Sequence, residues 1–551
     1  MQTAPPSATE SPNRLEWFAG ISITLVIAAL HIVFLFHRGG LWRDEVHQLT
    51  LARLETLDYL RHDSFPALAA FVIHGWTLVV SRTDAALRGL GLLTGLCVVG
   101  VLWLTTWRIA RKPPLFSLAL FALNPFVISY GDSLRGYGLG SLLILGFTAM
   151  IWMWLQKSSA PRLLALAVLA ALSVQALYQN TVLVAAVCAG AAAVCARQRL
   201  WRRLAGLFAA GLFAALTLLP YVGNISASSG AAGGAKSPWK LSRVFVPLQS
   251  ALDFPLPQFH LVWLVLTLAV LTLMIFSLRQ RRTADGAAGA GDLPLFAGTT
   301  IAVALAGYVW FLSRASVQTR AWHFIPLLAL TSVCFDLGLA GVARIGRVAA
   351  MGLAAALTLM ATPFSYRQLQ TRLTNVDWVA GKLSAEAKPG DYILITPWYC
   401  GITFDHYFQG RAAWDTIPPV NDHSANRTDL AVEQMKKPRA IAPVLEKVSA
   451  TLRRGGSVWI VGDTEIPEVA TPAPADLPPP PLQWTGWMDT PYNVIWDAQI
   501  AHFIRDHAHR FEPAATGLQQ PVSDLENLPL RVAEGWRDDI ISPPPTVLPI
   551  K

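Results

Sequence analysis

Long apolar runs separated by short polar segments dominate the first two thirds of the chain. A helix needs about 20 mainly apolar residues to cross the roughly 30 Å hydrocarbon core of a bilayer. The run Pro66–Val80 would reach only about 22 Å as a helix, so we expect it to lie along the outer interface as an amphipathic helix. The remaining runs predict eleven membrane-spanning helices, at residues 17–37, 86–107, 114–130, 138–156, 162–178, 180–196, 203–220, 259–278, 293–312, 321–340 and 347–365.

Short basic clusters between these runs indicate on which side each loop lies. If Pro66–Val80 does not span, every cluster falls on the same side as the N-terminus. Because cytoplasmic loops carry the excess of Lys and Arg, that side is predicted to be the cytoplasm. Residues 38–85 and 221–258 then form long outer loops, and the tail from residue 366 lies outside. The clusters are Arg108/Arg111/Lys112, Lys157/Arg162, Arg197/Arg199/Arg202/Arg203, Arg279/Arg281/Arg282 and Arg344/Arg347.

The tail has a different pattern, in which signals for helices and strands alternate. This alternation predicts a small α/β domain, and the Pro-rich segment 472–481 predicts a linker or extended arm. The expected fold is therefore an α-helical polytopic membrane module at residues 1–365, followed by an extracytoplasmic α/β domain at residues 366–551. The predicted elements of this α/β domain are the helices Val376–Ala387 and Pro443–Arg454 and the strands Asp391–Thr396 and Ser457–Val461.

The composition supports a membrane protein and argues against a nucleic-acid binder. Of 551 residues, 53% are hydrophobic and 14% are charged, whereas soluble domains contain about 25% charged residues. The net charge of +9 comes from basic clusters between apolar runs, the pattern of cytoplasmic loops. The five cysteines offer neither a disulfide framework nor a zinc-binding spacing.

The segment Leu41–His47 (LWRDEVH) places Arg43, Asp44, Glu45 and His47 directly after the first predicted span. A solvated interfacial loop is the alternative interpretation. Ionisable groups near membrane depth are costly, however, and tend to mark a functional site. We therefore predict one site on the outer face, because further polar residues recur at the outer ends of other runs, namely His62, Asp63, Asp132, Arg135, Tyr137, Arg320 and His323.

In their order and common side, these motifs resemble the GT-C glycosyltransferases, particularly protein O-mannosyltransferases and bacterial lipid A aminoarabinose transferases. Asp44-Glu45 after Arg43 matches the acidic pair in the first outer loop of that superfamily. Asn124-Pro125 leading to Ser133–Tyr137 resembles its second-outer-loop pattern, and Thr319–Pro326 (TRAWHFIP) resembles the Arg-aromatic-Pro stretch that opens a late helix.

The resemblance covers roughly residues 15–365, and two tail motifs, Val376–Trp378 and Pro389–Asp391, resemble accessory domains of bacterial members. It implies an integral protein of the bacterial inner membrane with an extracytoplasmic active site. The chain departs from the family at Phe65-Pro66, where many bacterial members have Lys-Pro-Pro. This departure puts one basic ligand of the donor in doubt.

The resemblance implies an inverting transferase whose donor is a sugar on a polyprenyl phosphate. Such a leaving group departs as a phosphate anion, so one carboxylate acting as general base is sufficient. Asp44 would be this base, and Glu45 would orient the acceptor or a divalent cation, for which carboxylates suit Mg²⁺ or Mn²⁺. The metal site itself is not assigned. The sequence leaves the sugar open, and the acceptor could be a protein, a lipid or a glycan.

The basic candidates for binding the departing phosphate are Arg135, Arg320 and His323, with Arg43 in addition, because guanidinium groups match phosphate oxygens. Arg320 and His323 could equally reach from a helix start to the interface. Asp132 could bind substrate or simply pair with Arg135. The other candidate substrate-binding residues are His47, His62, Asp63 and Tyr137. Outside the site, we expect His31 and His74 to pack within helices and Asp336 to pair with Arg344 or water.

Three other functions remain open at this point. A transporter or flippase for a lipid-linked sugar would use the same ligand, but it predicts charges near mid-membrane and inverted repeats with broken helices. A polysaccharide polymerase or ligase would share the donor. A non-catalytic scaffold would bind a partner through its outer domain and would not need Asp44.

Overall fold

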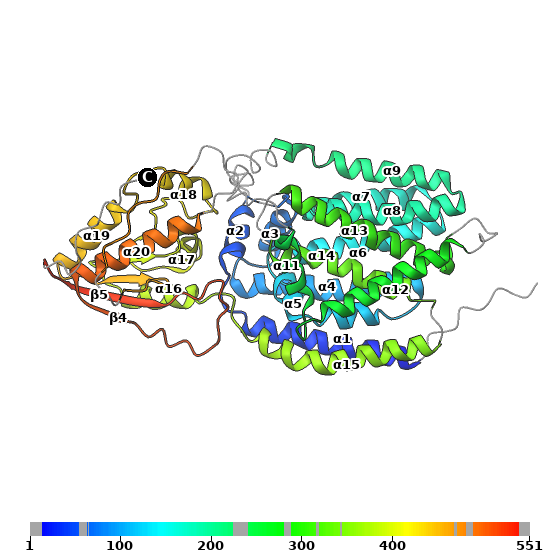
Figure 1. The fold of residues 1–551 in the computed structure, drawn as a ribbon, viewed down its shortest axis with the longest axis horizontal. Coiled ribbons are helices and arrows are strands. Elements are labelled where there is room, and N and C mark those ends of the chain that lie inside the picture. Colours follow the sequence, from blue (N-terminus) through cyan, green and yellow to red (C-terminus); the bar gives the residue numbers. More distant parts are fainter. Residues whose placement is uncertain are drawn as a thin grey trace, which may run out of the picture.

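The computed structural model describes residues 14–53, 63, 65–223, 241–279, 288–315, 319–341, 344–467, 471–480 and 489–538. The helices up to residue 369 form one bundle, and the later elements form an α/β unit packed against one end of it (Figure 1). The bundle helices are α1 (Arg14–His37), α2 (Arg43–Leu51), α3 (Leu68–Val79), α4 (Asp84–Ala110), η2 (Ser117–Ala122), α5 (Pro125–Gly131), α6 (Gly136–Gln156), α7 (Ala160–Ala176), α8 (Asn180–Gln198), α9 (Trp201–Leu216), η3 (Leu219–Tyr221), α11 (Ser242–Leu252), α12 (His260–Leu278), η4 (Ala290–Asp292), α13 (Leu293–Ala315), η5 (Ala321–Phe324), α14 (Ile325–Gly338) and α15 (Arg344–Leu369).

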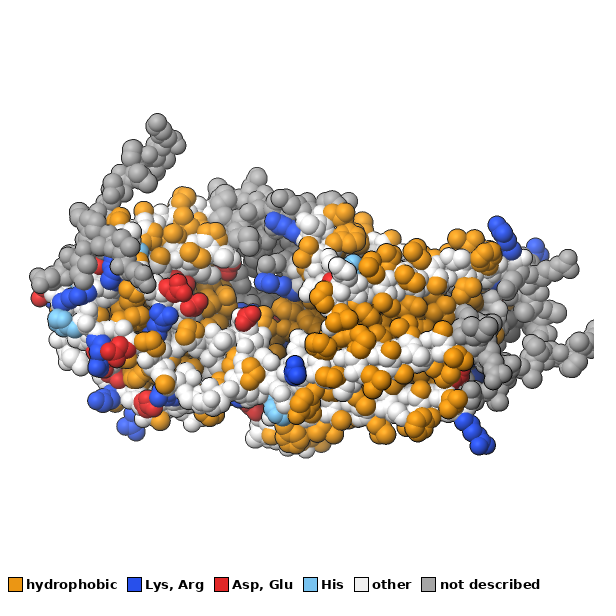
Figure 2. Space-filling model, turned by 60° about the horizontal axis from the view of Figure 1, so that its bottom comes forward, with side chains coloured by type: hydrophobic (Ala, Val, Ile, Leu, Met, Phe, Trp, Pro, Cys, Tyr) orange, Lys and Arg blue, Asp and Glu red, His pale blue; other side chains and the backbone are white. Residues whose placement is uncertain are grey.

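The bundle has the length and the surface of a membrane module. Within the described residues, nine helical segments are long and apolar enough to cross a bilayer, and they coincide with nine of the predicted runs. The polytopic helical class is thus confirmed. The run at 162–178 forms the 17-residue helix α7, and α3 is a 12-residue helix with Phe71 and Leu78 exposed. Apolar side chains cover the bundle face seen in Figure 2. The count of eleven spans stays a prediction.

The predicted span at residues 114–130 is broken into η2 and α5. A helix start in apolar surroundings leaves backbone N–H groups without partners. Asp336 of α14 accepts bonds from the backbone N–H groups of Phe116 and Ser117, both at 2.9 Å. The sequence predicts Arg344 or water as the partner of Asp336; the side chain of Arg344 lies outside the described residues, and that prediction stays untested beside these two amide contacts. At the second start, the side chain of Asn124 accepts from the N–H of Phe126 at 3.0 Å.

The two ends of the bundle differ in charge and in contacts. At one end, named here the basic end, Lys112, Arg197 and Arg203 donate to backbone carbonyls of neighbouring helices. The opposite end, named the domain end, contacts the α/β unit, where Tyr407 donates to Asp84 at 2.5 Å. Helix α1 ends and α4 begins at the domain end (Figure 1). Lys112, Arg197 and Arg203 therefore lie at the end of the bundle opposite the α/β unit, whereas Arg281 and Arg282 lie outside the described residues.

The α/β unit consists of a five-stranded sheet with helices on both faces. The strand order is β2-β1-β3-β5-β4, in which β1 pairs in parallel with β2 and β3, and β5 is antiparallel to β3 and β4. Alternate residues of β1 enter the two cores, because successive side chains of a strand point to opposite faces. Its elements are α16 (Val376–Glu386), β1 (Tyr392–Ile395), η6 (Trp398–Cys400), α17 (Gly401–Tyr407), β2 (Ala413–Thr416), α18 (Thr428–Met435), α19 (Ala442–Arg453), β3 (Val458–Val461), α20 (Thr490–His507), β4 (Ala508–Pro513) and β5 (Leu530–Trp536).

The two predicted helices and two predicted strands of the tail are confirmed as α16, α19, β1 and β3. The strands β2, β4 and β5 and the helices α17, α18 and α20 were not predicted. The proposed division of the chain at residue 365 falls inside α15, which continues to Leu369. That division stays a prediction.

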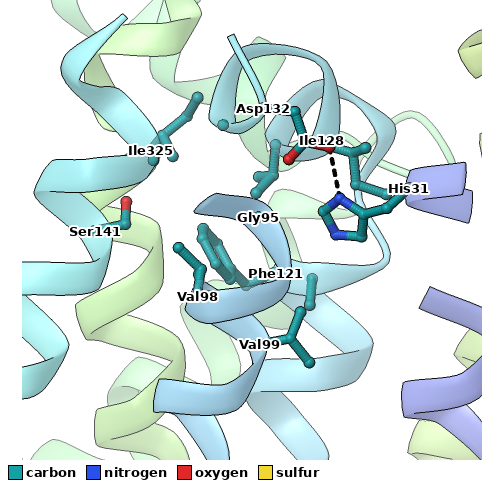
Figure 3. A pocket seen from close by; sticks show the side chains of 13 residues that line it. His31, Gly95, Val98, Val99, Phe121, Ile128, Asp132, Ser141 and Ile325 are labelled. Carbon is teal, nitrogen blue, oxygen red and sulfur yellow. Dashed lines mark hydrogen bonds and ion pairs between the residues drawn. The ribbon is translucent and has the colours of Figure 1, made fainter. Parts of the chain in front are cut away.

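A buried ion pair joins α1 to the turn after α5. His31 Nδ1 lies 2.7 Å from Asp132 Oδ2, and both side chains are almost completely buried. A cavity of about 20 Å³ adjoins the pair and is lined by Gly95 of α4, Ser141 of α6 and Ile325 of α14 (Figure 3). A methyl group on Gly95 would lie 2.0 Å from Asp132 Oδ1 and 2.6 Å from His31 Cε1. The close approach of α1, α4 and α5 therefore requires glycine at this position.

We expect Gly95→Ala to destabilise the protein by about 1–3 kcal/mol, the usual cost of overpacking a filled site. Gly100→Ala on the same helix is the matched control, because a methyl group there meets nothing within 4 Å. Thermal unfolding in detergent would compare the two variants. Equal transition temperatures for both would contradict the packing role of Gly95.

Candidate active site

The predicted acidic pair lies in the first turn of α2, at the domain end. Trp42 is the N-cap, so Arg43, Asp44 and Glu45 are the first helical residues. Consecutive residues of an α-helix point about 100° apart, since one turn takes 3.6 residues. The two neighbouring carboxylates therefore face different surroundings: Glu45 is fully buried, whereas the side chain of Asp44 is 21% exposed.

Glu45 is surrounded by hydrogen-bond donors. Its Oε1 accepts from Arg38 and from the backbone N–H of Leu134 at 3.0 Å, and its Oε2 accepts from Arg88 at 2.8 Å. Burial would raise the pKa of Glu45, but Arg38 and Arg88 hold it below its ordinary value. The carboxylate thus joins the end of α1, the start of α4 and the turn before α6. Both oxygens of Glu45 are engaged in these contacts, and its predicted part in catalysis stays a prediction.

Asp44 keeps part of its bonding capacity. Its Oδ1 accepts from Arg43 Nε at 3.2 Å, and its Oδ2 faces Arg135 at 3.7 Å, which is an ion pair without a hydrogen bond. Burial would raise the pKa of Asp44, but Arg135 and Arg43 hold it below its ordinary value. An ionised, partly exposed carboxylate with an unused lone pair can accept a proton from an acceptor group.

Arg135 lies directly beside Asp44, at the start of α6. Its guanidinium lies over the ring of Phe65, with 4.2 Å between the guanidinium carbon and the ring centroid. Tyr137 in turn packs its ring against Phe65 and His323, with centroids 5.4 Å and 6.3 Å away. Phe65, the residue at which the chain departs from the family pattern, thus supports an arginine. The predicted residues Arg135, Tyr137 and His323 are brought together with Asp44.

The start of α14 forms another wall of the site. Arg320 is exposed, and its backbone N–H donates to His323 Nδ1 at 3.0 Å. Beside them, the ring of Trp322 packs at a tilt against Tyr130 of α5, with 4.9 Å between ring centroids, and Trp42 meets Tyr130 edge-on at 6.2 Å. Aromatic rings of Trp42, Tyr130 and Trp322 therefore pack together beside the polar groups at this end of the bundle.

The remaining predicted site residues that the structure describes bond to partners other than Asp44 and Arg135. Asp63 accepts from Gln48 and lies 3.9 Å from His47 Nε2. His47 and Gln48 follow Asp44 by three and four residues on α2, so they lie on the same side of the helix as Asp44. His47 also accepts, through Nδ1, from the backbone N–H of Asn426. Asp132 binds His31 within the bundle and does not pair with Arg135 in the manner predicted. His62 lies outside the described residues.

The acidic pair is not arranged to share a metal ion. Both oxygens of Glu45 already accept from guanidinium groups, and Asp44 faces two more. Mg²⁺ and Mn²⁺ need several oxygen ligands converging on one point. Within the part of the chain that the structure describes, no group of three or more His, Cys, Asp or Glu side chains could hold a metal. A requirement for a divalent cation stays a prediction.

Several residues of the site were missed by sequence reasoning. Arg38 and Arg88 neutralise Glu45, and Arg88 carried a usable signal, because it is a charged residue within an apolar run. Glu526 and Tyr399 reach the site from the α/β unit: Glu526 accepts from the N–H of Arg43 at 3.1 Å, and the ring of Tyr399 lies 4.4 Å from its guanidinium. No local motif marks these two.

Comparisons with known proteins give only distant similarities. No protein-family model matches the sequence, and a search of curated proteins finds no match. Among solved structures, the chain is similar to ArnT from Cupriavidus metallidurans bound to undecaprenyl phosphate, with 12% identity and a TM-score of 0.48 over 81% of this chain and 93% of that one. The same protein in the apo state gives 12% identity and a TM-score of 0.49, over 81% and 94% of the two chains.

A third similar structure is the arabinofuranosyltransferase AftD from mycobacteria, in a mutant form. It shares 13% identity and gives a TM-score of 0.39, covering 94% of this chain but 42% of AftD. At these identities, the function of the present chain has to be argued from its own residues.

Proposed function

We propose that the protein is a membrane glycosyltransferase that transfers a sugar from a polyprenyl-phosphate donor to an acceptor, with Asp44 as the general base. The observation that carries this proposal is the contrast between two adjacent carboxylates. Glu45 is buried and fully bonded, whereas Asp44 is partly exposed, ionised and flanked by Arg43 and Arg135. A base next to cationic groups suits a reaction in which a nucleophile loses a proton and an anion departs.

In the proposed reaction, the acceptor nucleophile gives its proton to Asp44 and attacks the anomeric carbon from the side opposite the phosphate. The bond between that carbon and the phosphate oxygen breaks, and the electron pair leaves with the polyprenyl phosphate. Attack from the opposite side inverts the configuration at the anomeric carbon. Because the phosphate leaves as a stable anion, the site needs no second carboxylate as a general acid, which agrees with the engagement of Glu45.

The departing phosphate needs cationic partners, and Arg135 and Arg320 are the candidates that the geometry favours. Arg135 is held in place by Phe65 and Asp44, and Arg320 is exposed at the start of the η5–α14 segment. Guanidinium groups bind phosphate oxygens in pairs. Arg135 would supply the positive charge that Lys-Pro-Pro provides in many bacterial members of the family that the sequence resembles.

We further propose that the site faces the extracytoplasmic side of the bacterial inner membrane. Lys112, Arg197 and Arg203 lie at the end of the bundle opposite the α/β unit, and the positive-inside rule assigns a basic end to the cytoplasm. Asp44 and the α/β unit would then both lie outside. The acceptor would be met there, and the α/β unit, in contact with α2, is in a position to take part in its selection.

We expect Asp44→Asn to lower donor-dependent transfer by about 10²–10⁴-fold, the usual contribution of a general base. The measurement is transfer of label from a panel of polyprenyl-phosphate sugars in proteoliposomes that contain the native protein or the variant. Glu433→Gln, on the exposed surface of the α/β unit, is the control and should transfer at the native rate.

An active, folded Asp44→Asn protein would disprove the role of Asp44 while leaving the reaction class intact. Movement of the lipid-linked sugar across the bilayer in the same preparation, without transfer from any donor, would instead favour the flippase.

We expect Glu45→Gln to act on stability as well as activity. The amide cannot neutralise Arg38 and Arg88, and breaking a buried ion pair usually costs about 3–5 kcal/mol. The lowered pKa of Glu45 means that this stabilisation is present above the ordinary carboxylate range and is lost as the pH falls through the pKa of the folded state. Thermal unfolding of native protein and variant at neutral pH would measure the loss, and an unchanged transition would argue against the role of Glu45.

We expect chelation with EDTA to leave transfer within about twofold of the untreated rate. The reason is that the oxygens of Glu45 bind arginines and Asp44 has no second free carboxylate beside it. The assay would be repeated after addition of Mg²⁺ or Mn²⁺. Loss of transfer on chelation, with recovery on adding either ion, would establish the cation requirement that the sequence left open.

A further inference from the structure

The segment that connects α1 to the acidic pair is held mainly by the α/β unit. Five backbone groups between residues 37 and 43 bond to residues that follow α15, more than 300 positions away in the sequence, while the carbonyls of Gly39 and Gly40 accept from Arg88 of the bundle. This short segment leads directly to Asp44, so its backbone sets where that carboxylate lies. The bonds run from Gln520 Nε2 to His37 O (2.6 Å), from Leu373 N to Arg38 O (3.3 Å), from Gly40 N to Asp377 Oδ2 (3.1 Å), from Leu41 N to Tyr407 OH (2.6 Å) and from Arg43 N to Glu526 Oε1 (3.1 Å).

Among these partners, Glu526 is linked most directly to the proposed base, because it accepts from the backbone N–H of Arg43, the residue before Asp44. It is 1% exposed and precedes β5. Thr403 of α17 donates its hydroxyl towards both carboxylate oxygens, at 3.2 and 3.3 Å. The backbone carbonyl of Glu526 accepts from the N–H of Asn375 at 3.1 Å. The α/β unit therefore holds both the side chain of Glu526, through Thr403, and its backbone, through Asn375.

Arg43 connects Glu526 to Asp44 through its backbone and its side chain. Its N–H is one of the first amides of α2, which have no partner inside the helix, and Glu526 supplies one. Its guanidinium rests on the ring of Tyr399 and donates through Nε to Asp44 Oδ1. Backbone and side chain of Arg43 are thus both placed by the α/β unit, and the carboxylate of Asp44 follows them.

We propose that Glu526 is a positioning residue of the transfer reaction, which orients Asp44 through its hydrogen bond to the backbone N–H of Arg43. This inference rests on the proposed function. It gives the α/β unit a direct part in the chemistry, because the base would be correctly directed only while the unit is docked on the domain end. Misplacement of a reacting group by about 1 Å can cost about 100-fold in rate.

The charge of Glu526 gives the role a pH signature. Arg43, Asp44, Tyr399 and Cys400 are the titratable groups that face it, and burial raises the pKa of Glu526 to about 7. The ionised form accepts a stronger, charge-assisted bond from the Arg43 N–H. The turnover number should therefore rise as the pH increases through about 7. The pKa of Asp44 is lowered, so Asp44 does not change charge in this window.

The test compares Glu526→Gln, which keeps an acceptor oxygen, with Glu526→Ala, which removes it; Glu512→Gln on the exposed edge of β4 is the control. We expect Glu526→Ala to lower kcat by about 10- to 100-fold with little change in KM for the donor. Amide hydrogen exchange in peptides covering residues 38–47 should rise by about tenfold. Glu526→Gln should recover most of the rate and lose the rise near pH 7.

Native kcat and native exchange in Glu526→Ala would overturn the positioning role, as would an unchanged pH profile in Glu526→Gln. Should the alanine variant fail to fold, the near-isosteric glutamine variant still decides the question through its pH profile. Absence of transfer by the native protein with every donor would instead overturn the proposed function. The two failures are therefore distinguishable.

Discussion

The buried carboxylate of Glu45 is the interaction on which the rest of the site depends. Arg38 and Arg88 come from the ends of two membrane helices, and neither could remain charged at this depth without a counter-ion. Arg88 also donates to the carbonyls of Gly39 and Gly40. One carboxylate therefore fixes α1, α4 and the segment between α1 and α2. The position of Asp44 is a consequence, since it is the residue before Glu45 on the same turn.

Because Asp44 and Glu45 are adjacent on a helix, their side chains point in different directions, so one can hold the fold while the other meets a substrate. A carboxylate that holds a bundle together must be buried and fully bonded, whereas a base must keep a lone pair available to a substrate. Adjacent positions on α2 satisfy both demands because they point to different sides. The same separation appears among the arginines, with Arg38 and Arg88 engaged inside and Arg135 and Arg320 towards the open side.

Much of this arrangement could be predicted from the sequence, because it depends on local patterns. The apolar runs gave the nine clear helices, and the basic clusters placed α2 and the tail at the same end. The residues Asp44, Arg135, Tyr137 and His323 were found through charges or aromatic groups beside apolar runs. The break at η2 was missed, since the residue that caps it, Asp336, comes from a distant helix. The pairing of Asp132 with His31 across 101 positions was missed for the same reason.

The contribution of the α/β unit could not be predicted in this way, and it changes how the molecule should be understood. Glu526 and Tyr399 have no motif, and their importance comes only from docking onto α2. If the α/β unit made no contact with α2, its position could change without moving Asp44. Here the amides of Gly40, Leu41 and Arg43, which precede Asp44, find their hydrogen-bond acceptors in that unit, and buried amides need such partners. Docking of the unit and the geometry of the proposed base therefore share the same contacts, which run from Glu526 and Tyr399 through Arg43 to Asp44.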